Sequence, residues 1–356
     1  MPLKRESKRI VFLIGSMGKG GAERVISVLA NSYAAKGWKV DILLLLNSIC
    51  EYQLNKNINL IPICNENKSR LAQLPKWLFG IRKYVKENKP DKIVSFIARI
   101  NIITIIACLG LNRSIIISER NDPRADGRSI FVRFGTHLLY PLVNKIVFQT
   151  KWAQSCFSSR IQKKSVVIPN PIQVTTKASK IKEKKIVAVG RLVEQKNHAM
   201  LIRAFKKVHE KFPDYKLYIY GEGKLRNTLQ EQIKDLKLTD AVFLPGNVTS
   251  IHESIADAEM FVLSSDYEGL SNALLEAMMM GLPCISTNCA GSNEIISNNY
   301  NGILVSVDDE EQLSKAICDL INDKEKAFSL SQNAKRTLCS MNIDKVISLW
   351  EKAIEC

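Results

Sequence analysis

The sequence predicts an α/β protein with two doubly wound domains, each a parallel sheet covered by helices on both faces. Three observations lead to this prediction. Short apolar runs rich in Val and Ile alternate with helical stretches, as in sheets buried on both sides. These runs fall into two sets, separated by a polar, Lys-rich segment that follows Pro169 and Pro171. At 356 residues the chain also suits two domains of ordinary size.

The first expected domain covers residues 1–172. Its first strand is expected at 9–16, where the apolar run Ile10 to Ile14 is too short for a signal peptide, and a Gly-rich turn and a helix over 22–37 follow. Further strands are expected at 40–46, 92–97, 114–119 and 145–150. The most apolar region, 93–111, is interrupted by Arg99 and Asn101, so we expect a strand plus a buried helix there and no membrane span.

The second expected domain covers residues 173–342. Its strands are expected at 184–192, 215–223, 241–248, 260–265, 283–288 and 302–307, with helices between them such as the one over 198–212. A final helix at about 343–356 can pack back onto the first domain. Because ligands of such sheets bind at the carboxyl ends of the strands, we expect the ligand site in a cleft between the two domains.

The positive charge lies in the first half of the chain. Residues 1–170 hold 28 Lys and Arg against 10 Asp and Glu, whereas residues 171–356 hold 23 against 25. The first half is therefore expected to attract an anionic partner. No known nucleic-acid motif appears, which leaves a nucleic-acid-binding module as the less favoured alternative. Nine cysteines without a C-x-x-C pair indicate a reduced, interior compartment.

The segment "MFVLSSDYEGLSNALLEAMMMGLP" at 260–283 is typical of a strand, a loop and a helix. The helix start is expected to hold a diphosphate on backbone N–H groups, with help from the helix dipole. These groups belong to Gly269, Leu270, Ser271 and Asn272. Glu268 and Glu276 would repel that anion unless their oxygens accept hydrogen bonds from hydroxyls, so the pattern suits a nucleotide-sugar. The alternative is an N-terminal acid plus a solvated helical Glu.

Two cations stand at the end of the first strand of the same domain. Arg191 and Lys196, in "VGRLVEQKNH", could neutralise a leaving diphosphate, or they could be ordinary surface cations. The turn "YGEG" at 220–223 could let backbone approach a ligand, or it could be only a tight turn.

Together with "GGAER" at 20–24, "SERNDP" at 118–123, "IPNP" at 168–171 and "EGLSNALLEAM" at 268–278, these stretches resemble family 4 of the retaining glycosyltransferases. That family has two Rossmann-like domains in the GT-B arrangement, and the resemblance runs along essentially the whole chain. "GGAER" with "SERNDP" is similar to the branch that builds bacterial surface polysaccharides.

The resemblance implies roles for individual residues. Arg191 and Lys196 would bind the donor's phosphates, Glu276 the ribose hydroxyls, and Glu268 the transferred sugar near its anomeric carbon. The base would contact backbone around Asn247 and Val248. On the acceptor side the implied residues are Gly20, Gly21, Glu119, Arg120 and Asn121. Glu23 and Arg24, which follow the two glycines, can instead be purely structural helix residues, and Glu119, Arg120 and Asn121 can instead form a charged turn.

The resemblance also implies a donor, a UDP-sugar, and no bound metal. The sequence has no H-E-x-x-H or D-x-D motif. One departure concerns the His that many relatives carry after the fourth strand of the first domain, because "KIVSFIARIN" has none. His137 is expected to be a packing residue. We therefore name no general base and expect a front-face transfer in which the departing phosphate helps to accept the proton.

The stretch 68–89 raises the question of a membrane. Leu71, Leu74, Leu78, Ile81 and Val85 fall on one helical stripe, with Trp77, Tyr84 and several Lys and Arg around it. This is typical of an interfacial helix on anionic lipid, although a core-packing helix explains the stripe as well. The basic first half favours contact with an anionic membrane surface.

The sequence thus predicts an enzyme that moves a hexose or N-acetylhexosamine from a UDP-sugar, with retention, to a hydroxyl of a lipid-linked glycan in bacterial polysaccharide synthesis. The protein is expected to be cytoplasmic and peripheral on the inner face of the plasma membrane. Another GT-B nucleotide-sugar enzyme, such as an epimerase or a phosphorylase, is the alternative.

Overall fold

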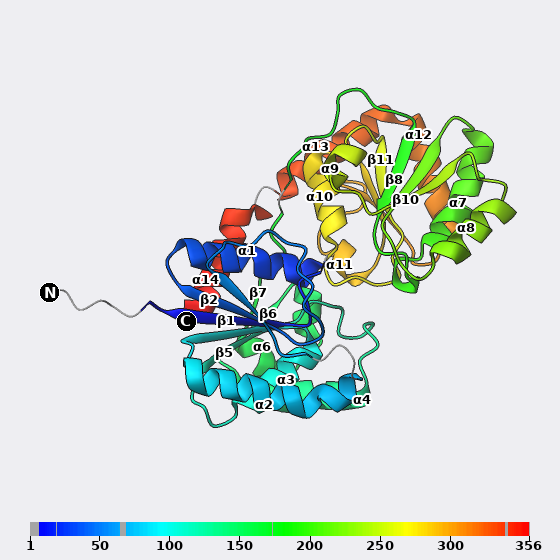
Figure 1. Cartoon of the computed structure of the whole chain (residues 1–356). Helices are drawn as coiled ribbons and strands as arrows, with labels where there is room; N and C mark the ends of the chain where they lie inside the picture. The colour runs from blue at the N-terminus through cyan, green and yellow to red at the C-terminus, as the bar shows by residue number, and fades with distance from the viewer. Residues whose placement is uncertain (1–6, 19, 65–68, 173, 339–340, 356) are drawn as a thin grey trace. The chain divides into compact units, whose positions relative to one another are not determined.

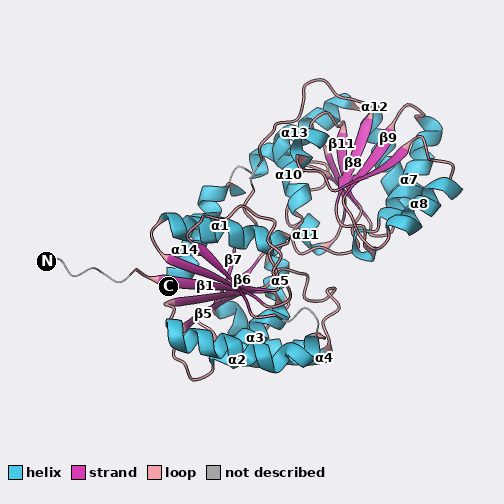
Figure 2. Cartoon of the chain, viewed as in Figure 1, coloured by secondary structure: helices cyan, strands magenta, loops and turns pink. Residues whose placement is uncertain are grey.

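The structure is a computed structural model that describes residues 7–18, 20–64, 69–172, 174–338 and 341–355. The chain divides into two units, each described here by itself (Figure 1). Unit 1 comprises residues 1–171 and 344–356, and unit 2 comprises residues 172–343. In each unit a sheet of parallel strands lies between layers of helices, as expected for a Rossmann-like α/β fold (Figure 2).

Unit 1 has a seven-stranded sheet in the order β3-β2-β1-β4-β5-β6-β7. The strands are β1 (Arg9–Ile14), β2 (Lys39–Leu44), β3 (Ile58–Pro62), β4 (Lys92–Phe96), β5 (Ser114–Ser118), β6 (Lys145–Phe148) and β7 (Ser165–Val167). The helices are α1 (Gly21–Ala35), α2 (Arg70–Asn88), α3 (Ala98–Cys108), α4 (Ile130–Leu139), the 3-10 turn η1 (Tyr140–Leu142), α5 (Lys151–Ser155), α6 (Ser159–Lys163) and α14 (Ile343–Glu355).

Strand β1 shows why this sheet is buried on both faces. Ile10, Phe12 and Ile14 join a core cluster with residues of α1 and α14. Val11 and Leu13 alternate with them and join a second cluster with residues of α2 and α3. The final helix α14 therefore belongs to the core of unit 1, where Trp350 stacks on Phe96 with ring centroids 5.5 Å apart.

Unit 2 has a six-stranded sheet in the order β10-β9-β8-β11-β12-β13. The strands are β8 (Lys185–Val189), β9 (Lys216–Tyr220), β10 (Val242–Gly246), β11 (Met260–Leu263), β12 (Cys284–Thr287) and β13 (Ile303–Val305). The helices are the 3-10 turn η2 (Glu194–Lys196), α7 (His198–Lys211), α8 (Arg226–Asp235), α9 (Ile251–Ile255), α10 (Asn272–Met280), α11 (Ala290–Asn293), α12 (Glu310–Asn322) and α13 (Lys324–Leu338).

The order of the second sheet creates a switch point. The chain runs from β8 outward through β9 to β10, and then returns to place β11 on the other side of β8. The loops after β8 and β11 consequently leave the sheet next to each other and diverge. In open α/β sheets such a point is the usual place for a ligand.

The predicted strands are all present, and the structure adds two edge strands, β3 and β7. Neither edge strand carries a run of fully buried apolar side chains, because β3 buries only Ile58 and the three residues of β7 are half-buried. An edge strand in this position needs only a partial apolar face, so no continuous apolar run in the sequence marks β3 or β7.

Helix α2 corrects the membrane argument made from its sequence. Trp77, Ile81, Tyr84 and Val85 are buried in the core of unit 1, so the two aromatic rings do not lie at a lipid interface. Leu74 is partly exposed, Leu78 packs against the core, and the side chain of Leu71 lies outside the described residues. The core-packing alternative is therefore confirmed for this stripe. No helix in the described part of the chain is long and apolar enough to cross a membrane.

Candidate functional site

Helix α10 begins at the switch point of unit 2. Its N-cap is Ser271, whose side chain accepts a hydrogen bond from the backbone N–H of Leu274. Its C-cap is Gly281, whose φ of 91° is the left-handed conformation that glycine adopts readily. The four residues 269–272 thus lead from the loop after β11 into the positive end of a nine-residue helix.

Glu268 lies directly before this helix start, and its carboxylate is buried. Oε1 accepts hydrogen bonds from Lys196 Nζ at 2.5 Å and from Ser265 Oγ at 2.7 Å. Within the described part of the chain both of these bonds go to Oε1, which leaves Oε2 to accept from a ligand hydroxyl. Sequence reasoning assigned Lys196 to the phosphates alone and missed its ion pair with Glu268.

The loops that carry Lys196 and Glu268 are fixed to each other. Asn197 Nδ2 donates to Asp266 Oδ1 at 2.7 Å, and the backbone N–H of Asp266 donates to the carbonyl of Gln195 at 2.9 Å. Ser264 Oγ donates to the carbonyl of Lys196 at 2.8 Å. The cation and the carboxylate are therefore held on two bonded loops at adjacent strand ends, which is how a preorganised site is built.

Glycines allow these loops to approach closely. A Cβ on Gly190 would lie 3.2 Å from the side chain of Lys196, and a Cβ on Gly291 would lie 2.3 Å from the carbonyl oxygen of Gly269. Gly221 has a φ of 136°, and a Cβ on it would lie 2.0 Å from the carbonyl oxygen of Gly190. The 220–223 turn therefore packs on the loop after β8, which supports the tight-turn interpretation of its glycines.

Glu276, on α10, is also buried and has a partner that the sequence did not indicate. Its Oε2 lies 3.1 Å from Nε2 of His252, on α9. The backbone N–H of Thr175 points to Nδ1 of the same ring, so Nδ1 accepts and Nε2 donates to the carboxylate. The solvated-helix interpretation of Glu276 is therefore wrong. No motif surrounds His252, and only the fold brings it to α10.

The remaining donor-side residues lie on the surface or near it. Arg191 is exposed in the loop after β8, five residues before Lys196. Asn247 is exposed just after β10, and Val248 packs partly against the core of unit 2. Their contacts with a nucleotide stay predictions.

The Gly-rich entry of α1 in unit 1 is held by an aromatic hydroxyl. Tyr52 Oη donates to the carbonyl of Gly20 at 2.8 Å, and the backbone N–H of Gly20 points back to it at 3.3 Å. A Cβ on Gly20 would collide with the carboxylate of Glu23. Gly20 is the N-cap and Gly21 the first residue of α1, and their approach to a substrate stays a prediction.

Glu119 follows β5, but it does not present a free carboxylate. It is buried, with Arg128 Nη2 at 3.0 Å and the hydroxyl of Tyr140 donating to Oε1. Burial raises the pKa of Glu119, and the Arg128 guanidinium opposes this shift. Arg128 also binds Asp126, so the network fixes the 119–128 loop. In this structure the carboxylate of Glu119 is therefore occupied by Arg128 and Tyr140, and its contact with an acceptor stays a prediction.

Arg120 is the unusual residue of this loop. Its guanidinium is buried, and none of its three nitrogens has a hydrogen-bond partner in the described structure. It lies against the rings of Phe96 and Trp350, at 5.3 and 5.5 Å from their centroids. Burial lowers the pKa of Arg120 to about 9. Asn121, the next residue, is exposed.

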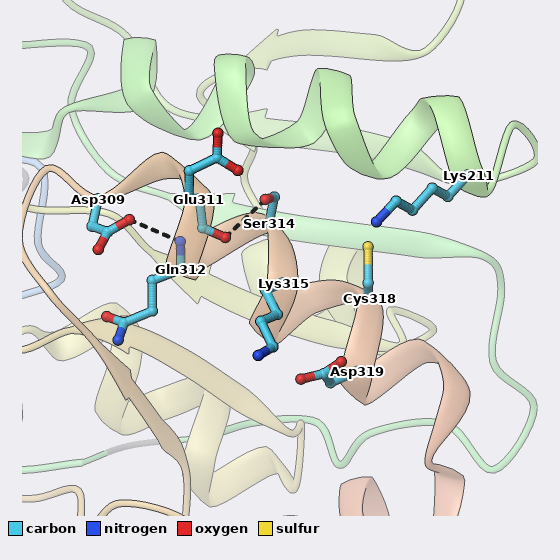
Figure 3. Close-up of a pocket in the computed structure, with 8 residues that line it drawn as sticks. All are labelled: Lys211, Asp309, Glu311, Gln312, Ser314, Lys315, Cys318 and Asp319. Atoms are coloured by element: carbon cyan, nitrogen blue, oxygen red, sulfur yellow. Dashed lines mark hydrogen bonds between the residues drawn. The ribbon is translucent and has the colours of Figure 1, made fainter.

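Figure 3 shows a separate polar hollow in unit 2, between α7 and α12. It is lined by Lys211, Asp309, Glu311, Gln312, Ser314, Lys315, Cys318 and Asp319, none of which belongs to the site at the switch point. In the described residues, no group of three or more His, Cys, Asp and Glu is arranged to hold a metal ion.

Two family models match this chain. Residues 172–337 match the family described as glycosyl transferases group 1, and residues 19–119 match the family described as glycosyl transferase 4-like. The chain belongs to these glycosyltransferases. The matches cover unit 2, with the whole Glu268–Lys196 site, and the part of unit 1 from the Gly-rich helix entry to Glu119.

Named relatives agree with this membership. A Campylobacter jejuni α-1,4-N-acetyl-D-galactosaminyltransferase, named for a GalNAc-containing glycan on PP-undecaprenol, is 28% identical over 97% of this chain and 98% of its own. A second C. jejuni enzyme, a 4-α-N-acetylgalactosaminyltransferase named for a diphospho-undecaprenol acceptor, is 28% identical over 92% of this chain and 94% of its own.

A solved structure shows the same fold. Anabaena HepE in complex with UDP has a TM-score of 0.84 at 18% identity, with 98% of this chain and 99% of that chain covered. This glycosyltransferase therefore has the two-domain GT-B fold that its sequence predicts.

Proposed function

We propose that this glycosyltransferase moves a sugar from a UDP-sugar to a hydroxyl of a lipid-linked bacterial glycan, with retention at the anomeric carbon. Two kinds of relatives support the substrates. Enzymes of similar sequence are named for acceptors on diphospho-undecaprenol, and a protein of the same fold was crystallised with UDP.

The observation that carries the donor proposal is the buried pair of Glu268 and Lys196 at the start of α10. A carboxylate beside a helix N-terminus and a lysine is a poor site for an anion alone, because it repels the anion. It is a good site for an anion attached to a sugar, because Lys196 and the N–H groups of residues 269–272 face the diphosphate while Glu268 accepts from a sugar hydroxyl.

Glu276 completes the nucleotide side of this proposal. Held by His252, its carboxylate would accept hydrogen bonds from the two ribose hydroxyls, while the backbone around Asn247 and Val248 would contact the base. Arg191, exposed and in the same loop as Lys196, would close on the phosphates as a second cation.

In the transfer step, the acceptor oxygen forms a bond to the anomeric carbon on the face from which UDP departs. The bond between that carbon and the β-phosphate oxygen breaks, and the proton of the acceptor hydroxyl passes to the departing phosphate. Lys196, Arg191 and the α10 dipole stabilise the charge that develops on UDP. In other enzymes a metal ion stabilises the charge on the departing diphosphate. Here the two cations and the helix dipole would stabilise it, so we expect no metal.

The acceptor side rests on Arg120. A buried guanidinium without a hydrogen-bond partner is rare, because desolvated donors lose free energy unless an acceptor satisfies them. After a movement of the 119–128 loop that exposes these donors, the diphosphate of a lipid-linked glycan would satisfy several of them at once. Gly20, Gly21 and Asn121 would contact the acceptor beside it.

Replacing Glu268 by Gln tests the proposed role of this carboxylate. The variant keeps the shape and the hydrogen bond from Ser265 but loses the charge, so UDP binding should stay within a few-fold while turnover falls at least ~100-fold. Turnover is measured as UDP released from UDP-sugars in the presence of a diphospho-undecaprenol glycan, and NMR of the product reports the anomeric configuration. Glu231→Gln, on the exposed face of α8, is the matched control.

Three results would contradict the proposal. Unchanged turnover in Glu268→Gln would remove the residue's role, inversion at the anomeric carbon would exclude the front-face step, and UDP release that ignores the acceptor would exclude a transferase reaction.

A further inference from the structure

Helix α4 of unit 1 exposes its large apolar side chains, which is the opposite of what a helix that only covers a core does. Its single buried side chain is Thr136. Its large apolar side chains are exposed instead: Ile130 by 75%, Phe131 by 84%, Phe134 by 69% and Leu138 by 59%. Large apolar side chains gathered on one exposed helix mark an interaction surface, whereas single ones are ordinary.

The spacing of these residues places them together. At 100° per residue, Ile130, Phe131, Phe134 and Leu138 fall within an arc of about 100° on one side of α4. Thr136 and Gly135 lie outside this arc, and a Cβ on Gly135 would lie 3.0 Å from Ile102 of α3. The helix thus turns its small residues to α3 and its apolar side outward. We call these four outward side chains the α4 face.

Two residues that follow α4 in the chain are also apolar and at least partly exposed. Leu142, in the η1 turn that directly follows α4, is 55% exposed. Trp152, at the start of α5, is partly exposed with the guanidinium of Arg124 4.8 Å from its ring centroid. An aromatic ring with a cation beside it is common at the boundary between lipid and water.

From Gly127 onward, the charged side chains of the segment that carries the α4 face have one sign. Residues 127–170 contain seven Lys and Arg and no Asp or Glu. Of these cations, Arg133, Lys151, Arg160, Lys163 and Lys164 are exposed. An exposed apolar helix side within a cationic surface complements a bilayer with anionic headgroups, where the apolar side chains enter the acyl boundary and the cations meet the phosphates.

We infer that the α4 face docks this glycosyltransferase on an anionic lipid bilayer. The inference rests on the proposed function in one respect: an acceptor with a long lipid chain remains in the bilayer, so the enzyme must work there. It differs from the expectation made from the sequence, which assigned lipid contact to α2. A second copy of the chain would also cover apolar side chains, but it would bring its own five exposed cations to the contact, and like charges repel.

The test uses the full-length chain and vesicles of phosphatidylethanolamine with phosphatidylglycerol. Phe131→Asn combined with Phe134→Asn should lower the sedimented fraction at least ~10-fold, because two exposed rings no longer enter the bilayer. Phe328→Asn is the matched control, since Phe328 is 67% exposed on α13 of unit 2. Vesicles of phosphatidylcholine alone should bind the wild type more weakly, because they offer no net negative charge.

A second measurement separates this inference from the proposed function. Stabilisation of the chain by UDP should be equal in wild type and double variant, because UDP binds unit 2. If UDP fails to bind while vesicle binding still depends on Phe131 and Phe134, the donor proposal fails and the docking surface stands. Equal sedimentation of wild type and double variant overturns the docking surface. So does a wild-type dimer that the two substitutions dissociate, since it would show that a second copy covers the α4 face.

Discussion

At the scale of single residues, the buried charges of this protein are of two kinds. Glu268, Glu276 and Glu119 are each satisfied by a partner within their own unit: Lys196, His252 and Arg128. Arg120 is buried without such a partner among the described residues. Removing one side of a satisfied buried pair leaves a bare charge and costs about 3–5 kcal/mol, whereas Arg120 has no pair to break. Its substitution should therefore separate function from stability.

Arg120→Met should leave the unfolding free energy within about 1 kcal/mol of wild type. The loss of attraction to the rings of Phe96 and Trp350 is offset by the removal of a desolvated cation. The KM for the lipid-linked acceptor should rise at least ~10-fold, with UDP binding unchanged. Acceptor titrations and urea unfolding check both parts. An unchanged acceptor KM, or a loss of several kcal/mol, would show that the guanidinium is only structural.

His198 supplies a second prediction at this scale. It is buried at the first turn of α7, and burial, with Lys196 nearby, lowers its pKa from 6.5 to about 4. Between these two pH values the unfolded chain binds a proton that the folded chain does not. The unfolding free energy should therefore be fully retained above pH 6.5 and decrease as the pH is lowered towards 4, by up to about 3 kcal/mol.

His198→Phe removes the titrating group and keeps a ring of similar size. The difference in unfolding free energy between wild type and variant, measured by urea at several pH values, isolates this histidine from the other groups that titrate. It should shift in favour of the variant as the pH decreases from 6.5 to 4. A difference that does not depend on pH would mean that His198 binds its proton equally in both states.

At the scale of elements, the sequence predicted what periodicity can show. Buried strands of a parallel sheet are continuous apolar runs, so β1 and β8 were found from the sequence alone. Periodicity reports that a helix has an apolar stripe but not what covers it. For α2 the stripe and the nearby aromatic rings Trp77 and Tyr84 turned out to be core, and for α4 the apolar side faces outward. Composition could not separate these two helices, because both have apolar and basic residues.

The candidate site shows the same limit. Glu268, Glu276, Arg191 and Lys196 were found because a loop and a helix start carry a recognisable spacing. His252 and Ser265 touch these carboxylates, but no local pattern marks them. His252 lies on α9, and Ser265 lies in the loop after β11. Only the strand order of unit 2 brings His252, with Thr175 bound to its ring, next to α10. Contacts between elements far apart in the sequence are set by topology, which spacing does not encode.

At the scale of the whole molecule, the two units differ in charge and in the substrates that we propose for them. The positive excess lies in the first half of the chain, together with the α4 face and Arg120, and the nearly neutral second half carries the proposed donor site. The division follows the substrates that we propose. A lipid-linked diphosphate at an anionic surface needs cations over a wide area, whereas a nucleotide-sugar needs two cations, a helix start and carboxylates for its hydroxyls.

The measurement that tests this account most directly is calorimetric titration of the wild-type chain and of Lys196→Met with UDP. Wild type should bind UDP and should bind UMP far more weakly, because the β-phosphate supplies the contact with Lys196 and the start of α10. Lys196→Met should bind UDP at least ~10-fold more weakly, while Lys224→Met, which removes an exposed lysine paired with Glu194, should bind as wild type does. Equal affinity of wild type and Lys196→Met for UDP, or no preference for UDP over UMP, would contradict the account.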